Sequence, residues 1–178
     1  MVNLIIVVED KREEQERALE AIKRSLGDVE EISEEKGGRV NLFRDCPSPM
    51  VALKSPDGGG TLIHFAATLE IAEIRLNSVR SFANCLQKVG VITDLMFPAK
   101  CGGKEEPNGL GIIAKCIEAK LRVVVCSDID HHDVDWLRPI FPILGKAHPT
   151  GDVPVILDKK DWDKAVALLA DTPVSAAA

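Results

Sequence analysis

The sequence predicts an α/β fold in which a parallel sheet of five strands lies between two layers of helices. Short apolar runs rich in β-branched residues, such as NLIIVV (3–8) and LRVVVC (121–126), are typical of buried strands. Segments with apolar residues at helical spacing follow these runs, as at residues 11–26. This alternation indicates right-handed strand–helix–strand crossovers and therefore a parallel sheet.

The first half of the chain carries two predicted strands and an insertion between them. A strand at residues 3–8 is followed by a helix at 11–26, which Asp10 can cap and Gly27 ends. The insertion covers about residues 28–60, where RVNLFRD (39–45) and PMVALK (49–54) have the pattern of short strands and SPDGGG (55–60) that of a turn. We therefore expect an antiparallel strand or hairpin before the second parallel strand, TLIHFAAT (61–68).

The second half of the chain continues the alternation. A loop with Pro and Gly-Gly is expected at residues 98–108. We expect helices at 69–86, 110–119, 136–144 (in part) and 162–169, and strands at 89–93, 121–126 and 153–157. The length suits one domain over residues 1–170, with a frayed tail at 171–178.

Bulk composition narrows the functional class. A formal charge of -6 without a basic block argues against a protein that binds nucleic acid through its phosphates. The first apolar run is too short for a signal peptide, and nothing approaches the roughly 20 apolar residues that span a bilayer. The five cysteines are odd in number and lack a C-x-x-C pair, which is typical of reduced thiols and predicts a cytoplasmic protein.

Polar side chains follow four of the predicted strands. Glu9 and Asp10 come directly after the first, Asp94 after the third, Ser127 after the fourth and Lys159 after the fifth. In open parallel sheets, ligands bind beyond the carboxyl ends of the strands, so we expect these groups to meet at one edge.

This set of side chains suits phosphoryl chemistry. Clustered carboxylates repel one another unless a cation lies between them, and hard oxygen ligands suit Mg²⁺. Asp94 can act as a carboxylate nucleophile toward a phosphoryl group, while Ser127 and a lysine bind the phosphoryl oxygens. Alone, each residue also has an ordinary structural interpretation, such as a strand end or a helix cap.

The order of these residues resembles the response-regulator receiver domain, the phosphoacceptor half of two-component signalling. The matching segments are the acidic pair at 9–10, DLMFP (94–98), VVVCSD (123–128) and the lysine after the last strand; EPNGLGIIAKCIEAK (106–120) is similar to the family's third helix. The resemblance covers most of the chain apart from about residues 28–60.

The resemblance implies a flavodoxin-like, doubly wound five-stranded parallel sheet in the order 2-1-3-4-5, with the insertion beside the edge strand. It implies that Asp94, Ser127 and Lys159 are catalytic and that Glu9, Asp10 and Asp94 hold Mg²⁺. It also implies a histidine kinase or phosphotransfer protein as donor and a downstream partner protein for output, while the oligomeric state stays open.

Departures from the family's pattern leave alternatives open. Lys159-Lys160-Asp161 replaces the usual Lys-Pro, so either lysine can be the site residue, and Ile156 stands at the usual aromatic switch position. A pseudo-receiver that binds partners without phosphorylation is the second hypothesis, and a metal-dependent phosphohydrolase is the third. DIDHHDVDW (128–136) has metal-binding residue types but also fits a solvated loop and helix start.

Overall fold

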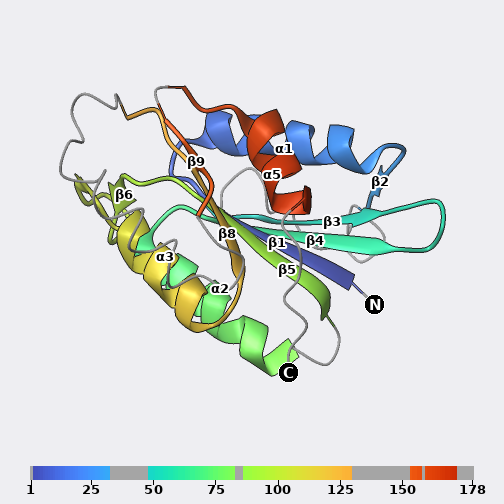
Figure 1. Ribbon diagram of the computed structural model, residues 1–178, viewed down its shortest axis with the longest axis horizontal. Coiled ribbons are helices and arrows are strands. Elements are labelled where there is room, and N and C mark those ends of the chain that lie inside the picture. Colours follow the sequence, from blue (N-terminus) through green and yellow to red (C-terminus); the bar gives the residue numbers. More distant parts are fainter. Residues whose placement is uncertain (1, 33–47, 83–85, 130–152, 158, 172–178) are drawn as a thin grey trace.

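A seven-stranded mixed sheet forms the centre of the molecule, with strand order β2-β3-β4-β1-β5-β8-β9 (Figure 1). The computed structural model describes residues 2–32, 48–82, 86–129, 153–157 and 159–171. The strands are β1 (Val2–Val8), β2 (Glu30–Glu31), β3 (Met50–Lys54), β4 (Gly60–Ala66), β5 (Leu86–Thr93), β8 (Arg122–Cys126) and β9 (Val155–Ile156).

Five of these strands are parallel neighbours. β1 pairs with β4 on one side and β5 on the other, and β5, β8 and β9 continue in the same direction. The predicted alternation of strands and helices is therefore confirmed, with five parallel strands as expected and two antiparallel strands that bring the sheet to seven. The helix expected at 69–86 ends at Phe82, and Leu86 begins β5. The sequence did not separate the two because an apolar residue fits the pattern of a helix as well as that of a strand.

The additional strands come from the predicted insertion. β3 runs antiparallel to β4, and β2 runs antiparallel to β3, so both extend the β4 edge of the sheet. The turn between β3 and β4 contains Gly58 at φ +84°, a backbone conformation that favours glycine. The expected hairpin beside the second parallel strand is confirmed, whereas the strand predicted at 39–45 lies outside the described residues.

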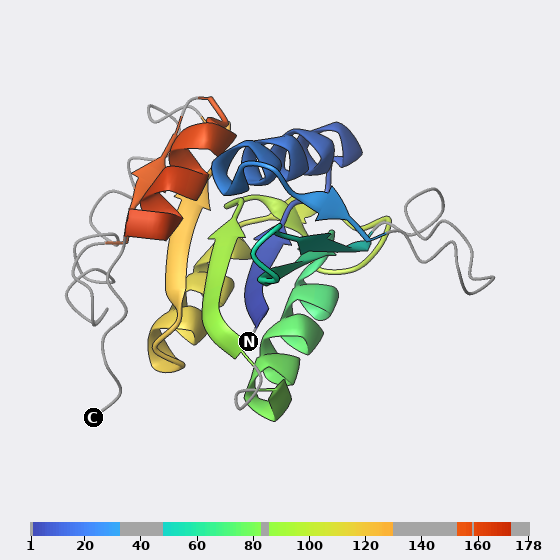
Figure 2. The same cartoon turned by 90° about the vertical axis from the view of Figure 1, so that its right-hand side faces the viewer.

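Helices cover both faces of the sheet. α1 (Arg12–Leu26) and α5 (Trp162–Asp171) lie on one face, and α2 (Leu69–Phe82) and α3 (Gly109–Glu118) on the other (Figures 1 and 2). Two apolar cores result, one on each side of the sheet. In α1, Ala18, Leu19 and Ile22 fall at helical spacing and are buried under the strands, and each large apolar side chain buried in this way contributes about 1.5–3 kcal/mol.

Two local expectations are corrected. Asp10 does not cap α1, since the cap position is Lys11, whose side chain makes no capping bond and whose backbone N–H donates to Glu9 Oε1 at 3.0 Å. The loop expected at 98–108 contains a small hairpin, in which β6 (Phe97–Pro98) pairs with β7 (Glu105–Glu106). Two-residue strands that include a proline leave no periodic signal in a sequence.

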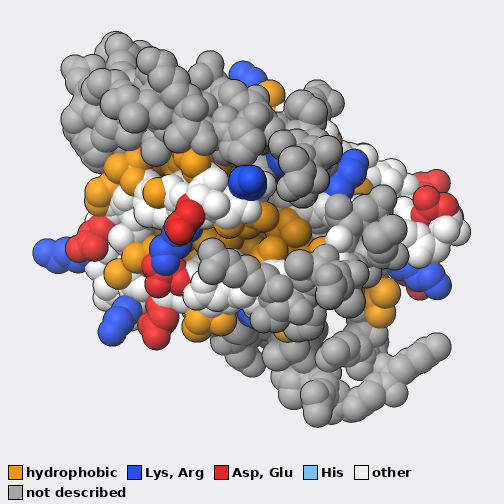
Figure 3. Space-filling model, turned by 60° about the horizontal axis from the view of Figure 1, so that its bottom comes forward, with side chains coloured by type: hydrophobic (Ala, Val, Ile, Leu, Met, Phe, Trp, Pro, Cys, Tyr) orange, Lys and Arg blue, Asp and Glu red, His pale blue; other side chains and the backbone are white. Residues whose placement is uncertain are grey.

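The surface on the α2 and α3 side shows hydrophobic side chains between charged ones (Figure 3). Ile74 on α2 is 58% exposed, while Leu76 and Val79 of the same helix face the sheet. Among the described helices, none has both the length and the apolar character that crossing a bilayer requires. The predicted helix at 136–144 and the tail at 171–178 fall outside the described residues, apart from Asp171.

Candidate functional site: a buried acidic pocket

The predicted site residues are held in place by backbone bonds that extend the parallel ladder past the strand ends. The Asp94 N–H donates to the Val8 carbonyl at 2.9 Å, and the Glu9 N–H donates to the Ala66 carbonyl at 3.0 Å. The Ser127 N–H likewise donates to Ile156 at 3.0 Å. Glu9, Asp94 and Ser127 thus lie at the same edge of the sheet because each is the first residue beyond its strand.

Asp94 is the centre of a network of short hydrogen bonds. Its Oδ1 accepts the Ser127 hydroxyl at 2.5 Å and the Leu95 backbone N–H at 2.6 Å. Its Oδ2 accepts the Lys160 ammonium at 2.6 Å, and the same ammonium donates to Glu9 Oε2 at 2.5 Å. One cation therefore joins two carboxylates that come from different strands.

Burial makes these charges interact strongly. Glu9, Asp94 and Lys160 are only 0%, 1% and 3% exposed. Burial raises the pKa of Glu9 to about 7; the Lys160 ammonium offsets part of this effect and the charge of Asp94 adds to it. Burial opposes the charge on Lys160, but Asp94 and Glu9 outweigh it and raise the pKa of Lys160 above its ordinary value. The pocket therefore keeps its ammonium charged and has one carboxylate that readily takes a proton.

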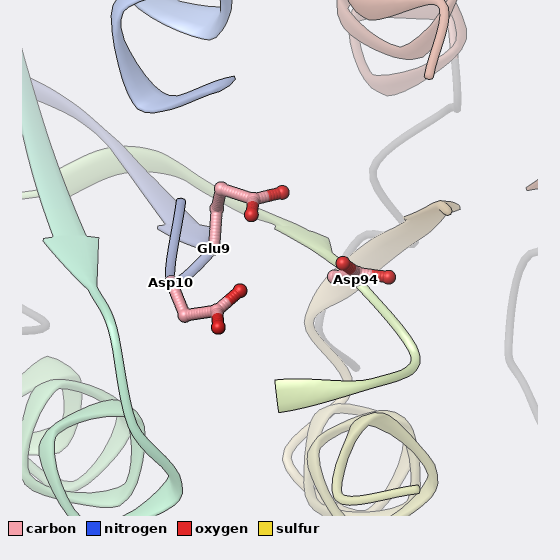
Figure 4. A group of neighbouring side chains, drawn as sticks. All are labelled: Glu9, Asp10 and Asp94. Carbon is pink, nitrogen blue, oxygen red and sulfur yellow. The ribbon is translucent and has the colours of Figure 1, made fainter. Parts of the chain in front are cut away.

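A third carboxylate gives the pocket the features of a cation site. Glu9, Asp10 and Asp94 each place an oxygen within 4.8 Å of the others, and the Glu9 and Asp10 side chains extend toward Asp94 (Figure 4). Asp10 Oδ1 is buried and has no hydrogen-bond partner in the described part of the chain. A buried acceptor without a partner costs about 1–3 kcal/mol. Three hard oxygen donors with one unsatisfied atom fit Mg²⁺.

The lysine of the site is Lys160, which corrects the prediction of Lys159. The side chain of Lys160 is buried between the two carboxylates, whereas Lys159 is exposed and lies in a groove beside α1. Lys160 was the alternative that the sequence left open. The strand before it, β9, has only two residues, so strand alternation cannot be followed through to the lysines.

Gly109, at the start of α3, is a positioning residue that sequence reasoning did not assign to the site. A Cβ at this position would lie 2.3 Å from the Asp94 carbonyl oxygen, and the Gly109 N–H donates to the Leu95 carbonyl at 3.1 Å. The helix therefore presses directly on the backbone that carries Asp94. Its signal in the sequence was the Gly of EPNGLG, without any indication of what it contacts.

A looser ion-pair cluster borders the pocket. The Lys11 ammonium lies 3.5 Å from Asp128 Oδ2 and 4.0 Å from Glu105 Oε1 on the β6–β7 hairpin. Asp128 is 52% exposed and its Oδ1 lies 4.0 Å from the Lys160 ammonium, so it marks the solvent side of the site. The His and Asp residues of DIDHHDVDW beyond Ile129 fall outside the described residues.

Comparisons with known proteins give only distant structural matches. No protein-family model and no curated protein sequence matches the chain. A futalosine hydrolase of Helicobacter pylori strain 26695 is 11% identical, with a TM-score of 0.37 over 97% of this chain and 96% of that chain. A 5'-methylthioadenosine/S-adenosyl homocysteine nucleosidase of Campylobacter jejuni is 11% identical, with a TM-score of 0.34 over 96% of this chain and 94% of that chain.

These findings overturn the expected membership in the receiver family. The similar solved structures are nucleosidases, and none of those reported above is a receiver domain. Their TM-scores of 0.30–0.37 are too low to carry an argument about activity. What the chain does must therefore be argued from its own side chains.

Proposed function

We propose that Asp94 accepts a phosphoryl group in a Mg²⁺-dependent reaction and that the protein signals through a partner protein. The observation that carries this proposal is the environment of the Asp94 carboxylate. This carboxylate contacts the Ser127 hydroxyl and the Lys160 ammonium, and two further acids lie beside it. The phosphoryl-accepting part of the proposal depends on these side chains and not on membership in any family.

The position of the pocket supports the proposal. Ligands of open α/β sheets bind beyond the carboxyl ends of the parallel strands. The five parallel strands lie in the order β4-β1-β5-β8-β9. This order supports a flavodoxin-like, doubly wound arrangement of order 2-1-3-4-5. The antiparallel strands β2 and β3 extend the sheet beyond β4 and leave the carboxyl ends of the parallel strands, where Asp94 lies, free.

The transfer step is a displacement at phosphorus. A carboxylate oxygen of Asp94 forms a new P–O bond, and the bond from phosphorus to the donor breaks. With a phosphohistidine donor the leaving group is the imidazole nitrogen, which keeps the electron pair, and with acetyl phosphate it is acetate. The product on the protein is an acyl phosphate, and the reaction consumes no oxidant or reductant.

Each neighbouring side chain has a task in this step. The Lys160 ammonium and the Ser127 hydroxyl, which now bind Asp94 itself, move their hydrogen bonds to oxygens of the incoming phosphoryl group. Glu9, Asp10 and Asp94 would hold Mg²⁺, which supplies positive charge against the phosphoryl oxygens. Burial strengthens all of these interactions because water does not screen them.

The choice of partners comes from the resemblance seen in the sequence and not from this chemistry. A histidine kinase or a phosphotransfer protein would supply the phosphoryl group, and a downstream protein would read the modified surface. The predicted cytoplasmic location agrees with such partners. The overall acidity of the chain, -6, gives no basis for nucleic-acid binding as its output.

The test is the intact mass of the full chain after incubation with acetyl phosphate and Mg²⁺. Parallel samples lack Mg²⁺, carry Asp94→Asn, or carry Asp28→Asn as a matched change at an exposed acid outside the pocket. We expect one labile phosphoryl group in the wild type and in Asp28→Asn, and none in the other two samples.

No adduct on the wild-type protein would overturn the proposal and favour a protein that binds partners without phosphorylation. Steady release of phosphate from many donor equivalents would instead favour the metal-dependent phosphohydrolase. The two outcomes differ because a hydrolase turns over, whereas an acceptor stops near one equivalent.

A further inference from the structure

An exposed acid, Asp128, lies between two ammonium groups at the mouth of the acidic pocket. Its Oδ1 is 4.0 Å from the buried Lys160 ammonium, and its Oδ2 is 3.5 Å from the ammonium of Lys11. Asp128 directly follows Ser127, whose hydroxyl bonds Asp94. A carboxylate of the chain itself thus occupies the position between a cation inside the pocket and a cation on its rim.

Both side chains on the rim are open to solvent. The Lys11 side chain is 42% exposed and that of Asp128 is 52% exposed, whereas Lys160 is buried. Exposed ion pairs are weak and are screened by salt, so the Asp128 carboxylate can turn toward water at little cost. An anion from solution can therefore reach this position and replace the carboxylate there.

The backbone of Lys11 holds its side chain at the pocket. Its N–H donates to Glu9 Oε1 at 3.0 Å, and its carbonyl accepts the N–H groups of Glu14 and Gln15 in the first turn of α1. The ammonium also lies 4.0 Å from Glu105 on the β6–β7 hairpin. Lys11 can thus exchange one anionic partner for another without a movement of the backbone.

The charges at the mouth favour an anion between the two lysines. Burial lowers the pKa of Lys11, but Asp128 and further acids outweigh it and raise the pKa above its ordinary value, so the ammonium stays charged. The Lys160 ammonium acts against this rise, because the two cations are close enough to repel each other. An anion between them relieves this repulsion, particularly where the charge of the pocket acids is offset by Mg²⁺.

We propose that the space between Lys11 and Lys160 is the entry site for the phosphoryl group of the donor. Asp128 fills this site in the protein without a donor and so blocks it. When the donor arrives, Asp128 turns toward solvent, and Lys11 and Lys160 each bind an oxygen of the phosphoryl group. The inference rests on the proposed function of Asp94, and it adds Lys11 as a donor-binding residue and Asp128 as an internal competitor.

The test measures the binding of orthophosphate to the full chain in Mg²⁺ at constant ionic strength, from the backbone amide shifts of Lys11, Ser127 and Lys160 in NMR spectra. Orthophosphate has the oxygens and charge of a phosphoryl group but cannot phosphorylate Asp94. We expect Asp128→Asn to bind it about threefold to tenfold more tightly than the wild type, because the competing charge is gone. Lys11→Met should bind it about threefold to tenfold more weakly, and Lys11→Arg, which keeps the charge, should stay within about twofold of the wild type.

Two matched controls show whether these effects are local. Lys54→Met removes an exposed lysine at the opposite end of the strands from Asp94, and Asp28→Asn removes an exposed acid outside the pocket. Neither change should alter the affinity for orthophosphate. The rate of labelling by acetyl phosphate should follow the order of these affinities, with Asp128→Asn the fastest and Lys11→Met the slowest.

Unchanged orthophosphate affinity in Lys11→Met would overturn the binding role of Lys11, and unchanged or weaker affinity in Asp128→Asn would overturn the role of Asp128 as a competitor. The absence of a saturable shift in Asp128→Asn at tens of millimolar orthophosphate would overturn the whole entry site. Labelling of Asp94 at the same rate in all variants would also overturn the entry site, while the proposed function would stand. The expected order of affinities without any labelling would instead support an anion site at the mouth and overturn Asp94 as the acceptor.

Discussion

The two ends of the parallel strands both carry charged side chains on the same face of the sheet, but they differ in how completely these side chains are paired. At the carboxyl end, the Lys160 ammonium is bonded to both Glu9 and Asp94, and Ser127 completes the set. At the amino end, Asn3 Oδ1 and Arg122 Nε have no hydrogen-bond partners among the described residues, and a cavity of about 200 Å³ lies beside their side chains. One end has satisfied its charges internally, whereas the other leaves two buried polar atoms unpaired within the described part of the chain.

This difference predicts how the stability of the protein responds to substitutions at each end. Where buried charges are mutually paired, removing one partner leaves the others uncompensated and costs stability. Where buried polar atoms are already unpaired, the free energy of unfolding already includes that cost, so removing the polar group leaves no partner uncompensated. Asp10 is the exception at the paired end, since its Oδ1 has no partner among the described residues and is the atom a cation would bind.

The largest effect is expected from Lys160→Met. Glu9 and Asp94 would then be buried side by side without their shared cation. We expect a loss of about 3 to 5 kcal/mol in the free energy of unfolding, measured by urea denaturation. Lys159→Met, one residue earlier and exposed, should change it by less than about 0.5 kcal/mol. Equal effects of the two substitutions would contradict the role of Lys160 as the shared cation of the two buried carboxylates.

A buried group between the two ends, His64 on β4, should show the next largest effect. Burial, together with the charge of Arg75, lowers the pKa of His64 to about 4. Because the unfolded chain protonates near pH 6.5, the stability that neutral His64 allows is present above that pH and is lost as the pH falls toward 4. We expect a loss of about 3 kcal/mol from this group between pH 7 and pH 4.

The check is the difference in unfolding free energy between the wild type and His64→Leu across this pH range. Both proteins share every other titrating group, so the difference isolates the imidazole. Both ring nitrogens of His64 lack partners among the described residues, so leucine removes no hydrogen bond that the structure records. A pH-independent difference would contradict the prediction.

Gly109 tests whether the position of Asp94 depends on the close approach of α3. Gly109→Ala places a methyl group 2.3 Å from the Asp94 carbonyl oxygen, so the backbone must move. We expect a loss of about 1 to 3 kcal/mol in stability and slower phosphorylation from acetyl phosphate. Gly111→Ala lies two residues later in the same helix with nothing within 4 Å, and it should stabilise by about 0.5 to 1 kcal/mol. Matching results for the two glycines would contradict the steric argument.

The smallest expected effect concerns Asp10, whose Oδ1 has no hydrogen-bond partner among the described residues. Without Mg²⁺, Asp10→Asn should be at least as stable as the wild type, because one of three neighbouring carboxylates loses its charge. With millimolar Mg²⁺, the wild type should gain on the order of 1 kcal/mol, measured as a rise in Tm, and the variant should gain less. The same Mg²⁺ response in both proteins would remove Asp10 from the proposed cation site.

Much of the carboxyl edge could be predicted from the sequence because apolar runs mark where strands end. Glu9, Asp94 and Ser127 are each the first residue after such a run, and the parallel ladder brings first residues together. Lys160 could not be chosen over Lys159 because β9 is only two residues long, so its direction into the pocket depends on tertiary packing.

The amino end could not be predicted because polar residues at strand starts look like ordinary solvent-facing positions. Only the register places Asn3 between Thr61 and Lys88, and only the packing of Leu169 against Gly90 covers that row with α5. The family assignment failed for a related reason. Five residues in order at strand ends describe where a site lies, but they do not distinguish among the proteins that share an α/β sheet.

The most direct test of the central claim is to identify the residue that carries the phosphoryl group. The full chain would be incubated with acetyl phosphate and Mg²⁺, reduced with borohydride to convert any acyl phosphate to an alcohol, and digested for peptide mass spectrometry. The account predicts that the reduced residue is Asp94. Reduction at Glu9 or Asp10, or no reduced residue in a sample that recovers the peptide containing Asp94, would contradict it.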